Sequence, residues 1–324
     1  ILLYCQNFSI IKMQILHLDS SHSILYKGLE KLGYSNHFKF KTSKEEIEKE
    51  ISYYDGIIVR SRFSIDKSFL KKAINLKFVA RVGSGLENID VEYAKNKKIV
   101  VVSAPSGNSN AVGEHAIGML LSLMNNMHFS QNEISSGIWS RESNRGFELK
   151  NKTVGIIGYG NTGKSFAKKL SGFGVQTLFY DVIQNKGDKY ATEASIRAIQ
   201  QKADIISIHT SLTKTSIGLI KKSFISNCKK PFWLINTSRG KCVVTKDIIS
   251  GIKNGKILGA ALDVIDFEKK SFNELTQPLK SEPKLLDYIN SKKIIITPHI
   301  AGWTHESKKN LSQITLEKIE NLKL

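Results

Sequence analysis

Residues 154–163 read VGIIGYGNTG, and Asp181 follows Gly163 by eighteen positions at the end of a second apolar run. An apolar strand, a G-x-G-x-x-G turn, a helix and a second strand that ends in an acid form a dinucleotide-binding fingerprint. Gly158 permits the tight turn, Gly160 lets a pyrophosphate approach the backbone, and Gly163 lets the helix pack closely on the strand. We expect the phosphates at the helix N-terminus, where N–H groups and the dipole favour negative charge. A purely structural βα turn is the alternative, but the full order of elements favours a cofactor site.

The carboxylate of Asp181 indicates which dinucleotide is bound. A carboxylate here can accept hydrogen bonds from both ribose hydroxyls, and it would repel a 2′-phosphate unless an arginine intervened. The next residues, 182–185, include no arginine. The sequence therefore predicts NAD as the cofactor in preference to NADP.

Length and cysteine content bound the class of protein. The 324 residues are enough for two domains with cores, and no apolar run approaches the roughly 20 residues that cross a bilayer. We therefore expect a soluble protein without a membrane partner. Cys5, Cys228 and Cys242 are widely spaced and odd in number, which favours a reducing, cytoplasmic location over a disulfide framework or a zinc site. No metal site is predicted.

The net charge of +19 raises the question of a nucleic-acid partner. Only seven of the 48 basic residues are arginines, and the lysines are spread along the chain. A dedicated nucleic-acid surface would more often cluster arginines with aromatic residues. We expect a solvated lysine surface and no specific nucleic-acid partner, although non-specific adsorption to polyanions stays open.

Short apolar runs alternate with amphipathic stretches, which is typical of parallel sheets covered by helices. The runs fall into two series and therefore predict two α/β domains. The first series is 15–18, 37–40, 56–59, 78–82 and 99–102, and the second is 153–157, 175–180, 205–209, 232–236, 257–262 and 294–297.

A long helix is expected over 110–136, with apolar residues on more than one stripe. A second subunit would cover the additional stripe, and full burial within the monomer is the alternative. A final helix over 305–324 is expected to return to the first domain, so the chain would cross between domains near Pro105 and Pro298, with the site in the cleft. Residues 1–12 lack the features of a secretory signal and are expected to be an extension upstream of Met13.

Three charged residues follow strands of the second series, where open α/β sheets place their ligands. They are Arg239, Glu268 and His299. Such a set suffices for hydride transfer between a 2-hydroxy acid and NAD. The histidine would exchange the hydroxyl proton, the arginine would hold the carboxylate and carbonyl oxygens, and the carboxylate would orient the imidazole. Asp263 and Asp266 lie near Glu268 and are alternatives for the carboxylate.

Five motifs in order carry a resemblance to a known family. Besides the fingerprint they are RVGSGLENID at 81–90, APSGN at 104–108 with VGEHA at 112–116, NTSRG at 236–240 and TPHIAGWT at 297–304. The chain resembles the D-isomer-specific 2-hydroxyacid dehydrogenases over nearly everything after Met13. That resemblance implies an α/β fold of two Rossmann-like doubly wound domains, with an NAD-binding domain at 108–297 inserted into a substrate-binding domain at 1–107 plus 298–324. It also implies a homodimer joined through helix 110–136.

The resemblance assigns roles position by position. Arg239 would bind the substrate, Glu268 would partner the histidine and His299 would be the acid/base. The other residues that it implies for substrate are Gly83, Ser84, Gly85 and Asn108, and those for the cofactor are Gly158, Tyr159, Gly160, Asn161, Thr162, Gly163, Asp181, His209, Thr237 and Asp263.

Arg60, Ser61 and Arg62 resemble a phosphate-contacting loop, since two arginines around a serine can present bidentate donors. The implied reaction is oxidation of D-3-phosphoglycerate to 3-phosphohydroxypyruvate, at the entry to serine synthesis. Plain surface arginines are the alternative for the loop. For the function, the alternatives are a smaller acid such as glyoxylate, hydroxypyruvate or pyruvate, and an NAD-sensing corepressor that binds protein partners.

The chain departs from the family pattern in three places. Ser211 stands where the family usually has proline, and the loop after Glu268 lacks its usual proline. The first departure affects the loop beside the cofactor, and the second leaves substrate selectivity open. No C-terminal regulatory domain follows, so we expect no serine feedback through such a domain.

Overall fold

The computed structural model describes residues 13–268, 275, 281 and 283–322. The chain divides into a first unit, Ile1–Ala104 with Lys308–Leu324, and a second unit, Pro105–Ser307, inserted between those two segments. The boundary expected near residue 298 precedes the observed one, so His299 falls in the second unit. The extension expected at residues 1–12 lies outside the described residues.

The first unit is built on a five-stranded sheet in which every neighbouring pair is parallel, in the order β2-β1-β3-β4-β5. This is one of the two common doubly wound orders, and its switch point lies between β1 and β3. The strands are β1 Gln14–His17, β2 Ser35–Phe38, β3 Gly56–Val59, β4 Phe78–Arg81 and β5 Val100–Ser103.

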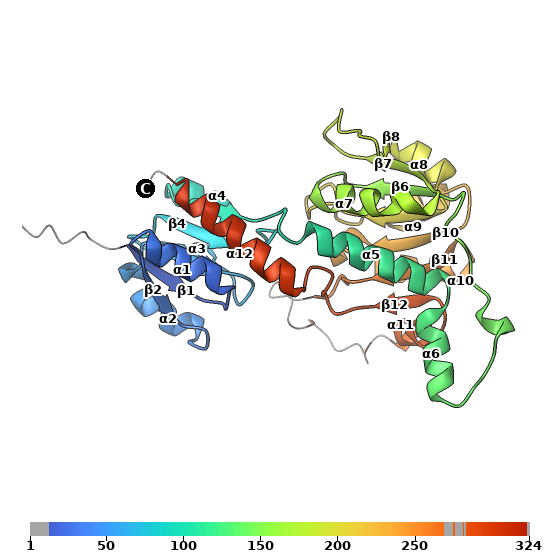
Figure 1. The fold of residues 1–324 in the computed structure, drawn as a ribbon, viewed down its shortest axis with the longest axis horizontal. Helices are drawn as coiled ribbons and strands as arrows, with labels where there is room; N and C mark the ends of the chain where they lie inside the picture. The colour runs from blue at the N-terminus through green and yellow to red at the C-terminus, as the bar shows by residue number, and fades with distance from the viewer. Residues whose placement is uncertain (1–12, 269–274, 276–280, 282, 323–324) are drawn as a thin grey trace, which may run out of the picture. The chain divides into compact units, whose positions relative to one another are not determined.

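Helices cover both faces of this sheet. Two apolar clusters, one on α2, α3 and α4 and the other on α1 and α12, divide the core between the faces. The final helix packs directly on α1, because a Cβ at Gly28 would overlap the side chain of Leu316 (Figure 1). The helices are α1 Ser23–Lys31, α2 Lys44–Glu50, the 3₁₀ turn η1 Ile51–Tyr53, α3 Lys67–Lys72, α4 Val91–Asn96 and α12 His305–Glu320.

The second unit contains a seven-stranded parallel sheet in the order β12-β11-β10-β9-β6-β7-β8. The order reverses between β6 and β9, as in a Rossmann sheet, which confirms the expected α/β class. The strands are β6 Thr153–Ile157, β7 Gln176–Tyr180, β8 Thr192–Glu193, β9 Ile205–Ile208, β10 Phe232–Asn236, β11 Ile257–Leu262 and β12 Ile294–Ile296. The short, exposed β8 carries no apolar run, and the sequence did not predict it.

Two layers of helices enclose this second sheet (Figure 1). Helices α5 and α7 pack on one face, and α8, α9, α10 and α11 pack on the other. The helices are α5 Ser109–Met124, α6 Met127–Ser135, α7 Asn161–Leu170, α8 Ile196–Lys202, α9 Lys222–Asn227, α10 Thr245–Lys253 and α11 Pro283–Ile289, with 3₁₀ turns η2 Glu142–Asn144, η3 Ser171–Phe173 and η4 Gly240–Cys242.

The single helix expected over 110–136 is wrong, because two helices occupy this range. Asn126 adopts a left-handed conformation with φ 53°, which asparagine tolerates better than most residues and which ends the first helix. Most apolar side chains of α5 are buried within the unit, whereas α6 buries none of its residues. The uncovered apolar surface therefore lies on α6 and the segment after it. No helix in the described part of the chain is both long and apolar enough to span a membrane.

Candidate active site

The glycine-rich turn joins β6 to α7 and has the geometry that a pyrophosphate needs. Gly158 has φ +93°, and a Cβ there would lie 2.7 Å from the carbonyl carbon of His209. A Cβ at Gly163 would overlap the Gly158 carbonyl oxygen, so the close packing of helix on strand depends on this glycine. At Gly160 no atom lies within 4 Å of the Cβ position, which leaves the backbone open to a ligand.

The same turn lies at the switch point of the sheet. His209 follows β9, the neighbour of β6, and its Nε2 lies 2.8 Å from Ser207 Oγ. Burial lowers the pKa of His209 to about 3, so its ring is neutral. Its Nδ1 and the Thr237 hydroxyl are both buried without a hydrogen-bond partner among the described residues. Such orphaned groups are costly unless a ligand satisfies them, so the residues present fit a bound dinucleotide.

Asp181 ends β7 and is already engaged by the protein. Its Oδ2 accepts the Tyr159 N–H at 2.7 Å, and its Oδ1 accepts the Ile183 N–H at 2.9 Å. Lys186 Nζ lies 3.2 Å from the same Oδ1. Burial alone would raise the pKa of Asp181, but these donors outweigh it and hold the pKa below its usual value. The sequence reasoning missed Lys186 because it searched only for arginine in the four residues after Asp181.

Tyr159 contributes to the turn through its backbone. Its ring is buried and stacks on Phe179 with centroids 3.9 Å apart, and its hydroxyl donates to Asp188 at 2.8 Å. Burial and this carboxylate raise the pKa of Tyr159. The side chain therefore anchors the loop after β7 to the glycine-rich turn.

His299 and Glu268 form a hydrogen-bonded pair. Glu268 Oε2 lies 2.8 Å from His299 Nδ1, and its Oε1 accepts the Ile265 N–H at 2.7 Å. Of the two alternative carboxylates, Asp266 accepts the Thr245 hydroxyl, while Asp263 binds the backbone of the histidine loop. Glu268 is thus the carboxylate that holds the imidazole.

Asp263, expected at the cofactor, organises the loop that carries His299. Its carboxylate accepts the Thr297 hydroxyl and the N–H groups of Ile300 and Ala301, at 2.8 and 2.9 Å for the latter two. Its carbonyl accepts the His299 N–H at 2.8 Å. His299 has φ 55°, a conformation rare outside glycine, and these bonds hold it there.

His115 supports the same loop, a role that the sequence reasoning did not assign. Its Nε2 lies 3.0 Å from Thr297 Oγ1 and 3.6 Å from Asp263 Oδ1. Its place in the VGEHA motif was the one available signal. Asn108 lies against the same loop, since a Cβ at Gly302 would overlap the Asn108 side chain.

Arg239 follows β10, and its Nη1 donates to the Ser238 carbonyl at 2.7 Å. The neighbouring Gly240 lies against the turn that carries Glu268, because a Cβ there would overlap the Ile265 carbonyl. Strands β10, β11 and β12 are adjacent in the sheet. Arg239, Glu268 and His299 therefore emerge from the carboxyl ends of three neighbouring strands of the second unit.

The residues expected to contact a phosphate gather in the first unit, beyond β3. The N–H groups of Arg60, Ser61 and Arg62 all point to Asp19 Oδ2, at 2.6, 3.2 and 3.4 Å. The Arg62 guanidinium donates to the carbonyls of Leu18, Lys39 and Thr42. Burial lowers the pKa of Arg60, and Asp19 opposes that shift. Asp19 is a second residue that the sequence reasoning missed.

Gly83, from the group expected at the substrate carboxylate, lies over Arg81. A Cβ at Gly83 would lie 2.7 Å from Arg81 Nη1, and Arg81 Nε donates to the Arg60 carbonyl at 3.1 Å. The loop at 83–85 is thus tied to the loop at 60–62 through one buried arginine.

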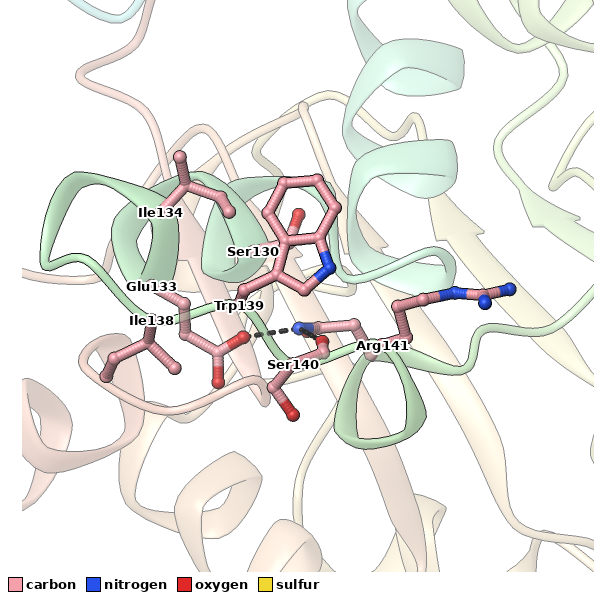
Figure 2. Close-up of a pocket in the computed structure, with 8 residues that line it drawn as sticks. Ser130, Glu133, Ile134, Ile138, Trp139, Ser140 and Arg141 are labelled. Carbon is pink, nitrogen blue, oxygen red and sulfur yellow. Dashed lines mark hydrogen bonds between the residues drawn. The ribbon is translucent and has the colours of Figure 1, made fainter.

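A separate pocket lies on α6 and the segment that follows it (Figure 2). Its lining is Ser130, Glu133, Ile134, Ile138, Trp139, Ser140, Arg141 and Asn144. Within the described ranges, no three His, Cys, Asp or Glu side chains are grouped to hold a metal ion.

Residues 117–301 match the model of the NAD-binding domain of D-isomer-specific 2-hydroxyacid dehydrogenases. The chain belongs to this family. It is 33% identical over 299 residues to the D-3-phosphoglycerate dehydrogenase of Archaeoglobus fulgidus, covering 91% of this chain and 54% of that protein. It is 31% identical to the hydroxypyruvate reductase of Thermotoga maritima, covering 85% of this chain and 87% of that protein. It spans about half the length of the phosphoglycerate dehydrogenases that it matches.

Among solved structures, the chain is similar to the D-lactate dehydrogenase of Aquifex aeolicus complexed with NAD and lactic acid. The TM-score is 0.80 at 26% identity, over 95% of this chain and 94% of that one. The family match and this neighbour confirm NAD as the cofactor.

Proposed function

We propose that the chain catalyses hydride transfer between NAD and a D-2-hydroxy acid. The observation that carries this proposal is the His299–Glu268 pair, with Nδ1 and Oε2 2.8 Å apart, on the sheet that also carries the glycine-rich turn. A histidine held by a carboxylate is a proton-transfer device. The turn and the orphaned groups of His209 and Thr237 supply a place for the dinucleotide.

Each residue has one task in this reaction. Glu268 engages Nδ1 of His299, so the ring presents Nε2 to the substrate hydroxyl and takes its proton during oxidation. Arg239 binds the carboxylate and the adjacent oxygen through its planar guanidinium. The glycine-rich turn would hold the dinucleotide, which would supply the hydride acceptor for oxidation of the acid at C2 and the hydride donor for the reverse reaction.

The first candidate substrate is D-3-phosphoglycerate, which the chain would oxidise to 3-phosphohydroxypyruvate for serine synthesis. Arg60 supports this substrate because a guanidinium can pair with a phosphate. The residue directly follows β3, next to the point between β1 and β3 where the strand order of the first sheet reverses. Several relatives in the comparison, including those of Archaeoglobus fulgidus and Bacillus subtilis, are D-3-phosphoglycerate dehydrogenases.

A smaller acid without a phosphate is the second candidate, and the loop beyond β3 favours it. The Asp19 carboxylate accepts hydrogen bonds from the three N–H groups of residues 60–62. Its negative charge would repel a phosphate at this loop. Arg62 is committed to backbone carbonyls. Glyoxylate, hydroxypyruvate and pyruvate are the acids of this type to test.

We also propose that two copies associate through α6 and the segment 137–147. The exposed apolar side chains there are Met127, Ile134, Ile138, Trp139 and Phe147. A second copy would cover them, and α6 is the C-terminal part of the range 110–136 from which the sequence predicts the interface. A cytoplasmic location stays a prediction.

NADH oxidation tests the enzymatic proposal, with 3-phosphohydroxypyruvate, hydroxypyruvate, glyoxylate and pyruvate offered separately. We expect turnover of at least one acid, and a fall in kcat of roughly 100-fold in Glu268→Gln. Glu30→Gln is the matched control, since Glu30 is exposed on α1 of the first unit, which carries neither the glycine-rich turn nor the proposed interface. Binding of NADH without turnover of any acid would instead favour a corepressor-like module.

A further inference from the structure

We propose that Lys186 sets how strictly this chain discriminates between NADH and NADPH. Its ammonium pairs with Asp181, the residue that would otherwise reject the 2′-phosphate of NADPH. The consequence is a chain that uses NADH by preference and also accepts NADPH. This inference rests on the proposed function only for its kinetic readout, because ligand binding tests it separately.

The hydrogen bonds that Asp181 already accepts leave few acceptor positions for the hydroxyls of a ribose. A carboxylate accepts about four hydrogen bonds, and Asp181 already accepts from Tyr159 N, Ile183 N and Lys186 Nζ. The adenosine ribose of NAD offers two hydroxyls, so one existing contact must yield. The two N–H groups belong to fixed backbone, and Lys186 is the partner that can move.

The loop after β7 directs Lys186 back toward Asp181. Asn185 turns the chain with φ 60°, and its N–H donates to Glu193 at 2.9 Å. Asp188, two positions beyond Lys186, is anchored by the Tyr159 hydroxyl at 2.8 Å. One contact before Lys186 and one after it therefore fix the position of the lysine.

Charge decides the effect on cofactor choice. A 2′-phosphate brings about two negative charges, and an unpaired Asp181 would repel it. The positive charge of Lys186 offsets the negative charge of the Asp181 carboxylate. When a ribose hydroxyl replaces the ammonium as a donor to Asp181, the ammonium can donate to the 2′-phosphate instead. Other charges in this region include the acids Asp188, held by Tyr159, and Glu193, held by the Asn185 N–H. They also include Lys189, over the Tyr190 ring, and Lys164, whose ammonium lies 5.5 Å from the Tyr159 ring centre.

The kinetic test compares the ratio of kcat/KM for NADH to that for NADPH in the wild type and in Lys186→Gln. We expect the ratio to rise about fivefold in the variant, as for a partly exposed ion pair, and to change little in Lys186→Arg. Lys189→Gln is the matched control, because it removes one positive charge from the same loop and its ammonium lies over the Tyr190 ring.

Binding gives a readout that needs no turnover. Calorimetry with ADP-ribose and with its 2′-phosphate should show the same fivefold shift in Lys186→Gln and none in Lys189→Gln. An unchanged ratio in Lys186→Gln, or an equal shift in both variants, overturns the proposal. A wild type that binds both ligands but reduces no 2-oxo acid overturns the proposed function while leaving this inference supported.

Discussion

His17 in β1 is buried, and its environment keeps it uncharged. Burial lowers its pKa to about 4, the hydrogen bond to Asn36 opposes this, and His37 adds to it. In the unfolded chain the pKa of this side chain returns to about 6.5. As the pH falls below 6.5, His17 therefore binds a proton in the unfolded chain but stays unprotonated in the folded chain. Stability from His17 is present above pH 6.5 and is lost toward pH 4.

We predict that His17→Gln weakens the acid sensitivity of the first unit. Between pH 7 and pH 5 its free energy of unfolding should fall by about 2 kcal/mol less than that of the wild type. Urea titrations followed by circular dichroism at both pH values measure this. His305→Gln, at an exposed histidine, is the control. Equal losses in wild type and His17→Gln would show that His17 is protonated in the folded state.

At the level of single residues, the sequence predicted which charged side chains stand beyond strand ends, and their catalytic roles stay predictions. Arg239, Glu268 and His299 each follow a strand, and parallel strands bring their carboxyl ends to one edge. The sequence did not predict the contacts of Lys186 and Asp19, because these contacts depend on loop conformation. A lysine five positions after Asp181 contacts it only when Asn185 reverses the backbone.

At the level of elements, Gly240 controls how closely the loop after β10 approaches the loop after β11. We predict that Gly240→Ala destabilises the second unit by about 2 kcal/mol, because a methyl group must displace the Ile265 backbone. It should also lower kcat, since Ile265 donates to Glu268. Thermal unfolding and NADH turnover measure the two effects. Gly172→Ala has no atom within 4 Å of the added carbon and should match the wild type. A Gly240→Ala protein with wild-type melting and turnover would contradict the packing argument.

Apolar runs predicted most strands well. Strands β3, β6, β10 and β11 have the bounds expected from the sequence, because each is a short apolar run bounded by polar or charged residues, glycine or proline. The break between α5 and α6 was missed, since two asparagines within an apolar pattern do not by themselves end a helix. It is the left-handed Asn126 that ends it.

At the level of the whole molecule, two α/β units could be predicted from two series of strands, but strand order could not. Periodicity says which residues are buried and nothing about which strand lies beside which. The motif order carried that information through the family resemblance. The sequence also could not predict that α6 buries none of its residues within the chain.

We predict that Trp139→Asp weakens self-association. Trp139 is 83% exposed, and burial of a tryptophan at the centre of an interface contributes about 2 kcal/mol. The dissociation constant of the dimer should therefore rise about 30-fold, as measured by analytical ultracentrifugation. Ile74→Asp changes an exposed apolar residue of the first unit and is the control. A monomeric wild type, or a Trp139→Asp dimer of unchanged affinity, would contradict the proposed interface.

The place of α12 has a consequence for biosynthesis. Leu311, Leu316 and Ile319 complete the cluster that also contains Ile15 and Leu25. A ribosome makes these three residues only after it has made all of 105–307. One apolar face of the β1–β5 sheet must therefore lack its α12 cover, and keep only that of α1, while the inserted unit is translated, and that unit can finish folding first.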